Sequence, residues 1–166
     1  MEDSRVNQSG PLRIRKEAVL VELALARDNP RQVEVFLAEH RANEFRRQHV
    51  LDLLEHVQAF LPARDPATGR WEIFNKESLL WIGVPLSPFG VESEVGDDEL
   101  FEFRRPVRVD LVGADPLEGE LLYSAPEEST RLVDYLNEKG RFLRLWARDR
   151  LYLINKAFVL RVVQTG

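Results

Sequence analysis

The amino-acid sequence predicts an α+β protein, mostly β, formed by tandem duplication of a β-β-α-β-β unit. Three observations support this prediction. The stretches HVLDLLEHVQAFLPA (49–63) and RLVDYLNEKGRFLRL (131–145) each contain an Asp, a Leu two residues later, and Phe-Leu eight residues after the Asp. An Asn-Lys pair follows a predicted strand in each half, and strand and turn signals recur in the same order. Each unit is expected to be a curved antiparallel sheet or partial small barrel with one helix against it.

The first unit is predicted to span residues 17–86. Its strands are indicated by short apolar or alternating runs, and its turns by RDNPR and DPATG. The first run, AVLVELAL, has a periodicity that would also allow a helix. The predicted elements are strands at 18–25 and 33–38, a helix at 44–57, and strands at 59–63, 71–75 and 78–84.

The second unit is predicted to span residues 101–166. VRVDL alternates apolar and polar residues, GADPLEG (113–119) contains turn residues, and Pro126 ends the next strand because proline cannot donate to a sheet. Ser129 or Thr130 could cap the helix, and Gly140 could stop it. The predicted elements are strands at 107–111 and 120–125, a helix at 127–140, and strands at 141–147, 151–155 and 158–163.

Alignment of the two units matches several residues on equivalent elements. The structural repeat positions are Asp52 with Asp134 and Asn75 with Asn155, and the Asn pair is followed by Lys76 and Lys156. Asn tolerates turn conformations, so the Asn-Lys pairs are expected to form corners between strands. The functional interpretation is that the two lysines face a shared anionic ligand.

Two segments lie outside the units. Residues 1–16 are predicted to be a flexible N-terminal tail. Residues 87–100 contain five acidic residues and no basic one, so they are predicted to be an acidic linker. This segment accounts for much of the formal net charge of −5, and neither unit is basic enough to indicate a general nucleic-acid binder.

Composition narrows the class of protein. The chain has 166 residues, of which 44% are hydrophobic, as expected of a globular protein. It contains no cysteine, no run of eighteen apolar residues and no signal-peptide pattern at its N-terminus. These features predict a cytoplasmic protein without membrane contact.

No motif for catalysis, cofactor binding or metal binding is found. Phosphate-loop and dinucleotide motifs are absent, as is the G-x-S-x-G turn of many hydrolases. His49, Asp52 and His56 share the polar side of the predicted helix, where a solvated face is the better interpretation than a metal site. The sequence therefore predicts no enzyme activity, no cofactor and no metal.

Aromatic residues fall on predicted strands. They are expected to lie mainly in the core, whereas a Trp on the outer face of an edge strand would indicate a docking surface. They are Trp71, Trp81, Trp146, Tyr152 and Phe158. The strands at 78–84 and 158–163 are near-continuous apolar runs, so both are expected at or near the contact between the units, with Trp81 part of that contact.

Three family resemblances are present. VRVDLVGADPLEGELLY (107–123) is similar to the opening strands of Sm-like and SH3-like small barrels. With the preceding FRRP, it also resembles the start of PilZ domains, the cyclic di-GMP receptors: Arg104 and Arg105 match their Arg-rich opening, while YSAPEES does not supply their second motif. The pattern DYLN…FLRL…INK resembles uncharacterised bacterial domains, which imply no activity.

The function expected from these features is that of a non-enzymatic bacterial cytoplasmic adaptor or assembly module that acts through protein–protein contacts. A protein partner is expected, and a homo-oligomer is one form it could take. The first alternative is a sensor that binds an anionic small molecule or nucleotide near Arg104 and Arg105. The second is an Sm-like nucleic-acid-binding module, which the acidic balance does not favour.

Overall fold

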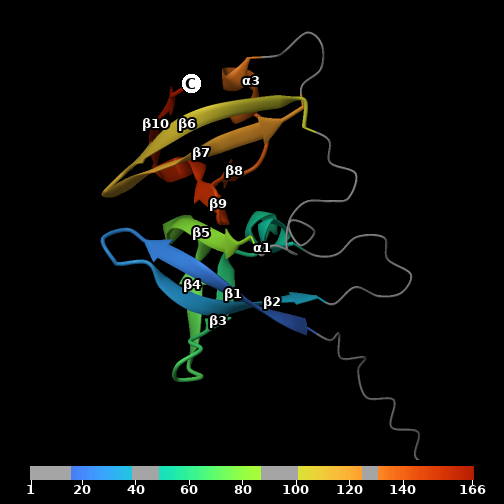
Figure 1. Cartoon of the computed structure of the whole chain (residues 1–166). Helices are drawn as coiled ribbons and strands as arrows, with labels where there is room; N and C mark the ends of the chain where they lie inside the picture. Colours follow the sequence, from blue (N-terminus) through green and yellow to red (C-terminus); the bar gives the residue numbers. More distant parts are fainter. Residues whose placement is uncertain (1–15, 39–48, 87–100, 125–130) are drawn as a thin grey trace, which may run out of the picture.

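A single antiparallel sheet of ten strands organises the molecule (Figure 1). The computed structural model describes residues 16–38, 49–86, 101–124 and 131–166. Over these residues the strand order is β10-β6-β7-β8-β9-β5-β1-β2-β3-β4. The first half of the chain thus forms one end of the sheet and the second half forms the other, as the blue-to-green and yellow-to-red ribbons show.

Alternating burial explains why the first half forms strands. In β2 the inward side chains Val33, Val35 and Leu37 are buried, while their neighbours are more exposed. The elements are β1 (Lys16–Leu25), β2 (Arg31–Ala38), α1 (Val50–Glu55), β3 (Phe60–Arg64), β4 (Trp71–Asn75), the short 3₁₀ helix η1 (Lys76–Ser78) and β5 (Leu79–Pro85). The first predicted strand, for which a helix was also possible, is therefore a strand.

The second half has a similar order of elements, and its strands also alternate. In β6 the side chains of Val107, Val109 and Leu111 are buried on one face. The elements are β6 (Phe103–Leu111), β7 (Ala114–Tyr123), α3 (Leu132–Leu136), β8 (Phe142–Trp146), β9 (Arg150–Asn155), the 3₁₀ helix η2 (Lys156–Phe158) and β10 (Val159–Gln164).

The predicted fold class is wrong. The molecule is not an α+β protein of duplicated β-β-α-β-β units with one helix each: strands make up 59% and helices 14% of the described residues, and all ten strands share one sheet. The helices are short because little of them is buried. Only Val50 and Leu54 are buried in α1, and no residue of α3 is. Within the described ranges, no helix has the length and apolar character needed to cross a membrane.

The two halves join where β5 pairs antiparallel with β9, with Trp81 opposite Ile154. The expectation that the strand at 78–84 and Trp81 lie at this contact is confirmed. The same expectation for the strand at 158–163 is wrong, because β10 pairs with β6 at the far end of the sheet. Its apolar run does not reflect burial on both faces, since Leu160 is 66% exposed.

The hydrophobic core also crosses the junction. Phe142, Leu151 and Leu153 of the second half pack with the first-half strands in one cluster. Leu80 and Trp81 of the first half pack with the second-half strands in another. Each half therefore supplies side chains to the core of the other.

The turn between β6 and β7 is shorter than the sequence predicted. The prediction placed a turn over 113–119, but β7 already begins at Ala114, and Gly113 takes the left-handed conformation with φ of 66°. Gly119 serves close packing of strands instead. A Cβ at this position would lie 2.6 Å from the carbonyl oxygen of Trp146 in β8.

Several predictions concern residues outside the described ranges. These are the acidic linker, the helix residues before position 49, the candidate caps Ser129 and Thr130, and the N-terminal tail apart from Lys16, which begins β1.

Candidate functional site: an exposed apolar surface on β3 and β4

Large apolar side chains are exposed on the outer face of the hairpin formed by β3 and β4. Phe60, Trp71 and Ile73 are 58%, 56% and 73% exposed. On the opposite face of the same strands, Leu61, Ala63 and Phe74 are buried. Pro62 lies opposite Ile73 in the register and is also exposed. We call Phe36, Phe60, Pro62, Trp71 and Ile73 the β3–β4 surface.

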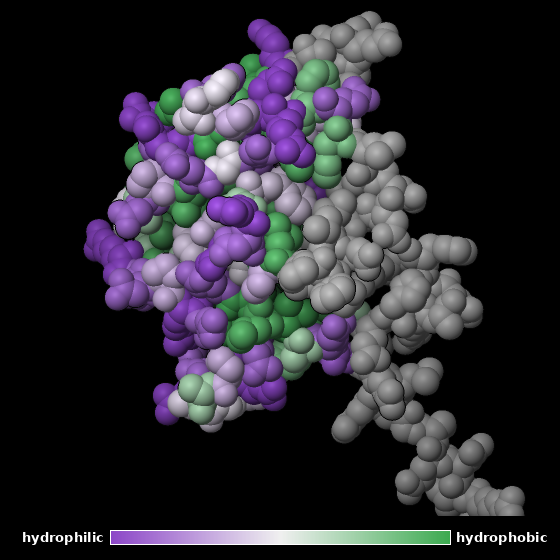
Figure 2. All heavy atoms as spheres, viewed as in Figure 1, coloured by the Kyte–Doolittle hydropathy of each residue, from purple (hydrophilic) through white to green (hydrophobic). Residues whose placement is uncertain are grey.

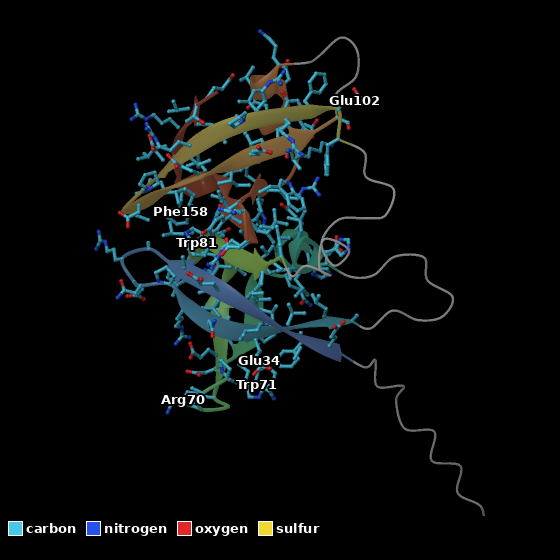
Figure 3. The ribbon with its side chains drawn as sticks, in the orientation of Figure 1. Glu34, Arg70, Trp71, Trp81, Glu102 and Phe158 are labelled. Carbon is cyan, nitrogen blue, oxygen red and sulfur yellow. The ribbon has the colours of Figure 1, made fainter. Side chains whose placement is uncertain are left out.

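Phe36 of β2 joins this surface through Trp71, because the centroids of their rings are 5.0 Å apart. The Arg64 guanidinium lies 5.2 Å from the centroid of the Phe36 ring and 5.8 Å from that of Trp71. Arg64 is itself held by an ion pair of 3.0 Å with Glu34. Figure 3 shows Glu34, Arg70 and Trp71 close together beside this hairpin. The rings are thus fixed in place while their outer sides face solvent.

A contiguous exposed apolar area is a common mark of a protein–protein contact. Figure 2 shows hydrophobic residues gathered over the first-half strands on the visible face. The aromatic residues on the strands were expected to lie mainly in the core, and Trp71 is an exception. It lies on the outer face of the last strand of the sheet, which is the condition under which a Trp would indicate a docking surface.

A basic pocket of about 400 Å³ forms a second candidate site. It brings Lys76 and Lys156, the two lysines of the Asn-Lys pairs, into one place. Arg141 and Phe142 of the second half also line it, together with Asn155. A second pocket of about 370 Å³ adjoins it, since both are lined by Phe142 and Lys156.

The charges of this pocket are engaged within the molecule. Nζ of Lys76 donates to the carbonyl oxygens of Leu53 and His56 at the end of α1, and the Arg141 guanidinium donates to those of Leu54 and His56. Burial, and then the charge of Arg141, lower the pKa of Lys76, while Glu55 acts in the opposite direction.

Glu55 connects the two halves at the same place. Its carboxylate accepts hydrogen bonds from the backbone N–H groups of Arg141 at 3.0 Å and Phe142 at 2.8 Å. Nζ of Lys156 donates to the carbonyl oxygen of Glu138 at 3.0 Å. The side chains of the pocket thus have a structural role. They donate hydrogen bonds to the carbonyl groups at the ends of the helices, and they hold α1 against β8.

Arg104 and Arg105 lie on β6, away from both pockets. Arg104 forms an ion pair of 3.3 Å with Glu120, and its side chain is largely exposed. Arg105 lies over the ring of Phe103 and donates to the carbonyl oxygen of Arg104. The structure thus does not bring these arginines together with Lys76 and Lys156.

The repeat positions have local structural contacts. Asp52 accepts a hydrogen bond from the backbone N–H of His49 at 2.8 Å, and Asp134 forms an ion pair with Arg131. Asn75 and Asn155 each cap a 3₁₀ helix by accepting a backbone N–H. The expectation that the Asn-Lys pairs form corners is confirmed by η1 and η2.

Sequence reasoning missed Phe60, Ile73 and Arg141. A signal for the first two exists, because strands 60–64 and 71–75 carry apolar residues on both faces while only one face can be buried in a terminal hairpin. Arg141 gave no signal, since its role depends on α1 lying 85 to 87 residues away in the chain.

Comparison with protein-family models, with curated proteins and with solved structures finds no match for this chain.

Proposed function

We propose that the protein is a non-enzymatic assembly module that associates with protein through the β3–β4 surface. The observation that carries the proposal is the exposure of Phe60, Trp71 and Ile73 on one outer face at the end of the sheet. Burying a large apolar side chain stabilises a complex by about 1.5–3 kcal/mol, so three together supply a strong contact. A Trp at the centre of such a contact often contributes most of the binding energy.

The alternatives have less support. In the basic pocket, Lys76 and Arg141 already donate to helix carbonyls, which leaves less capacity for an anionic ligand. Arg104 is exposed and Arg105 is partly buried on β6, and neither lines either of the two pockets. The formal net charge of −5 gives no general attraction to nucleic acid. A cytoplasmic location belongs to the proposal and is supported by the absence of cysteine.

The test compares association of the native chain, the variant Phe60→Ser/Ile73→Ser and the control Val112→Ser. Val112 is 45% exposed in the β6–β7 turn, so the control removes an exposed apolar side chain elsewhere. Chemical cross-linking in extracts of cells that produce the protein naturally, followed by quantitative mass spectrometry, detects both other proteins and further copies of the chain.

We expect the double variant to lose roughly thirtyfold in affinity for its partner, as the loss of about 2 kcal/mol at a binding hot spot predicts. The control should bind as the native chain does. Equal cross-linking of the double variant and the native chain would overturn the proposal.

A further inference from the structure

We infer that β4 of one copy pairs with β10 of a second copy, so that the sheet continues from molecule to molecule. This inference rests on the proposed function, because it names the partner of an assembly module as another copy of the same chain. Over the described residues, β4 and β10 are the two ends of the strand order, and each has one edge without a neighbouring strand.

The junction inside the molecule already shows this pairing. There β5, which follows η1, pairs with β9, which precedes η2. The free strands are the complementary pair: β4 precedes η1 and β10 follows η2. A copy that places its β10 on the β4 of its neighbour would therefore repeat, between molecules, a contact that the fold makes within one.

The outward backbone groups of β4 can be assigned from its hairpin partner. The N–H of Lys76 donates to the carbonyl oxygen of Ala59, and that of Asp65 to Arg70. Because hydrogen-bonded pairs alternate along an antiparallel ladder, the N–H and C=O groups of Trp71 and Ile73 point away from β3. These groups form the free edge.

The same reasoning applies to β10. The N–H of Thr165 donates to the carbonyl oxygen of Pro106 in β6. Since Val162 lies opposite Val109 in this ladder, Val162 and Gln164 direct their backbone groups away from β6. Each terminal strand thus has two residues, two positions apart, whose backbone N–H and C=O groups are free to pair with the other strand.

The internal junction fixes the register. In it, the N–H of Leu86 donates to Asp149, and Ile82 lies opposite Leu153. If the Asn75 and Asn155 corners are equivalent, Ile73 corresponds to Leu153 and Val162 corresponds to Ile82. Ile73 of one copy therefore lies opposite Val162 of the second copy. By the same shift, Glu72 falls opposite Val163, as Tyr152 lies opposite Gly83 in the junction.

Burial supports this register. At the internal junction, Leu80, Ile82 and Leu153 are buried almost completely. At the free edges, the corresponding residues are Leu160, Val162 and Ile73, of which Leu160 is 66% and Ile73 73% exposed. In the proposed register Ile73 and Val162 lie opposite each other and therefore on one face. Leu160 lies outside this pair, because the register of β10 shifts between Val159 and Arg161. Pairing therefore covers the apolar side chain of Ile73, which is otherwise in water.

Pairing of unlike edges is heterologous, so it builds a closed ring or an open filament. Two substitutions block one edge each. Ile73→Pro and Val162→Pro remove an outward N–H and leave the ladders with β3 and β6 intact, because neither residue donates to them. Ile73→Val keeps the N–H and serves as the matched control.

Light scattering coupled to size-exclusion chromatography should show oligomers for the native chain and for Ile73→Val. Each proline variant alone should be a folded monomer by circular dichroism, with at least about tenfold weaker self-association. An equimolar mixture of the two should form a dimer that grows no further, because it has one intact β4 and one intact β10. Persistence of oligomers in either proline variant would overturn the inference.

A second measurement does not depend on the proline variants. The chain has no cysteine, so Glu72→Cys/Val163→Cys introduces the sole thiols. Opposed antiparallel residues have Cα atoms about 4.5–5.5 Å apart, which permits a disulfide. Mild oxidation should link copies into a ladder of covalent multimers, while either single substitution should give at most a dimer. Absence of multimers would contradict the register.

The two proposals fail differently. If the native chain is monomeric but Phe60→Ser/Ile73→Ser still abolishes cross-linking to another protein, the pairing of copies is wrong and the proposed function stands. If the chain is monomeric and that variant changes no cross-link, both are wrong.

Discussion

At the scale of single residues, the basic side chains of the pocket hold helix ends. Lys76 is only 3% exposed and satisfies two carbonyl groups at the end of α1, where backbone acceptors lack partners within the helix. Lys156 has a similar position in the second half, but it satisfies one carbonyl group and is less buried. The two lysines are thus equivalent in sequence and unequal in their contacts.

Substitution of the two lysines by methionine should show this inequality. Lys76→Met removes the side-chain donor to the Leu53 carbonyl and one of the two donors to the His56 carbonyl, so it should lower the free energy of unfolding by about 1–3 kcal/mol. Lys156→Met should have a smaller effect. Urea unfolding followed by circular dichroism measures both. Equal losses in the two variants would show that burial does not decide the contribution of these lysines.

The residues of the site were partly predictable. The recurrence of Asn-Lys indicated the corners at Asn75 and Asn155, because a turn is a local property of the sequence. The exposure of Ile73 was not predictable from its strand alone, since it depends on β4 being the last strand of the sheet. The part played by Glu55 was not predictable either, because its partners are Arg141 and Phe142 in the other half.

At the scale of elements, the two Asn corners position the central strands. The side-chain oxygen of each Asn accepts a backbone N–H of the following 3₁₀ helix. Asn155 does more: its Nδ2 donates to the carbonyl oxygens of Leu79 at 3.0 Å and Glu77 at 3.3 Å. The end of β9 is thereby tied to the start of β5, in addition to the ladder between them.

Alanine at these corners should have unequal effects. Asn155→Ala removes three hydrogen bonds and leaves the Leu79 carbonyl without this donor, so we expect a loss of about 1–3 kcal/mol in unfolding free energy. Asn75→Ala removes one hydrogen bond at an exposed corner and should cost about 1 kcal/mol or less. Hydrogen exchange should show faster opening at β5 in Asn155→Ala only. Equal exchange in both variants would refute the proposed tie.

Strand positions followed from the sequence, but their partners did not. Apolar residues that alternate with polar ones, as in β2, predict a strand from neighbouring residues alone. The pairing of β5 with β9 joins segments about 70 residues apart, and no turn signal specifies it. The predicted helices run past the observed ends: they were expected to reach 57 and 140, whereas α1 ends at Glu55 and α3 at Leu136.

At the scale of the whole molecule, the crossing of core side chains makes the halves interdependent. Trp81 is 6% exposed and packs edge-to-face on Tyr152 of the other half, with ring centroids 4.9 Å apart. Figure 3 shows Trp81 and Phe158 at the level where the halves meet. Arg150 of β9 also forms an ion pair with Glu22 of β1 across this junction.

Trp81→Ala should therefore destabilise both halves together. Truncation of a buried Trp costs about 3–5 kcal/mol, and the transition should remain single. Denaturant unfolding, followed by hydrogen exchange in β2 and in β7, measures each half separately. Trp71→Ala is the control, since Trp71 is largely exposed and its loss should change stability little. A second half that keeps its midpoint while the first unfolds early would contradict the shared core.

The position of β5 has a consequence for the nascent chain. Synthesis proceeds from the N-terminus, so β5 leaves the ribosome well before β9, which begins at Arg150. Until β9 arrives, β5 has an open edge and uncovered apolar side chains, which include Leu80, Ile82 and Val84. That interval, during which about 65 further residues are translated in several seconds, is when the chain most needs a chaperone.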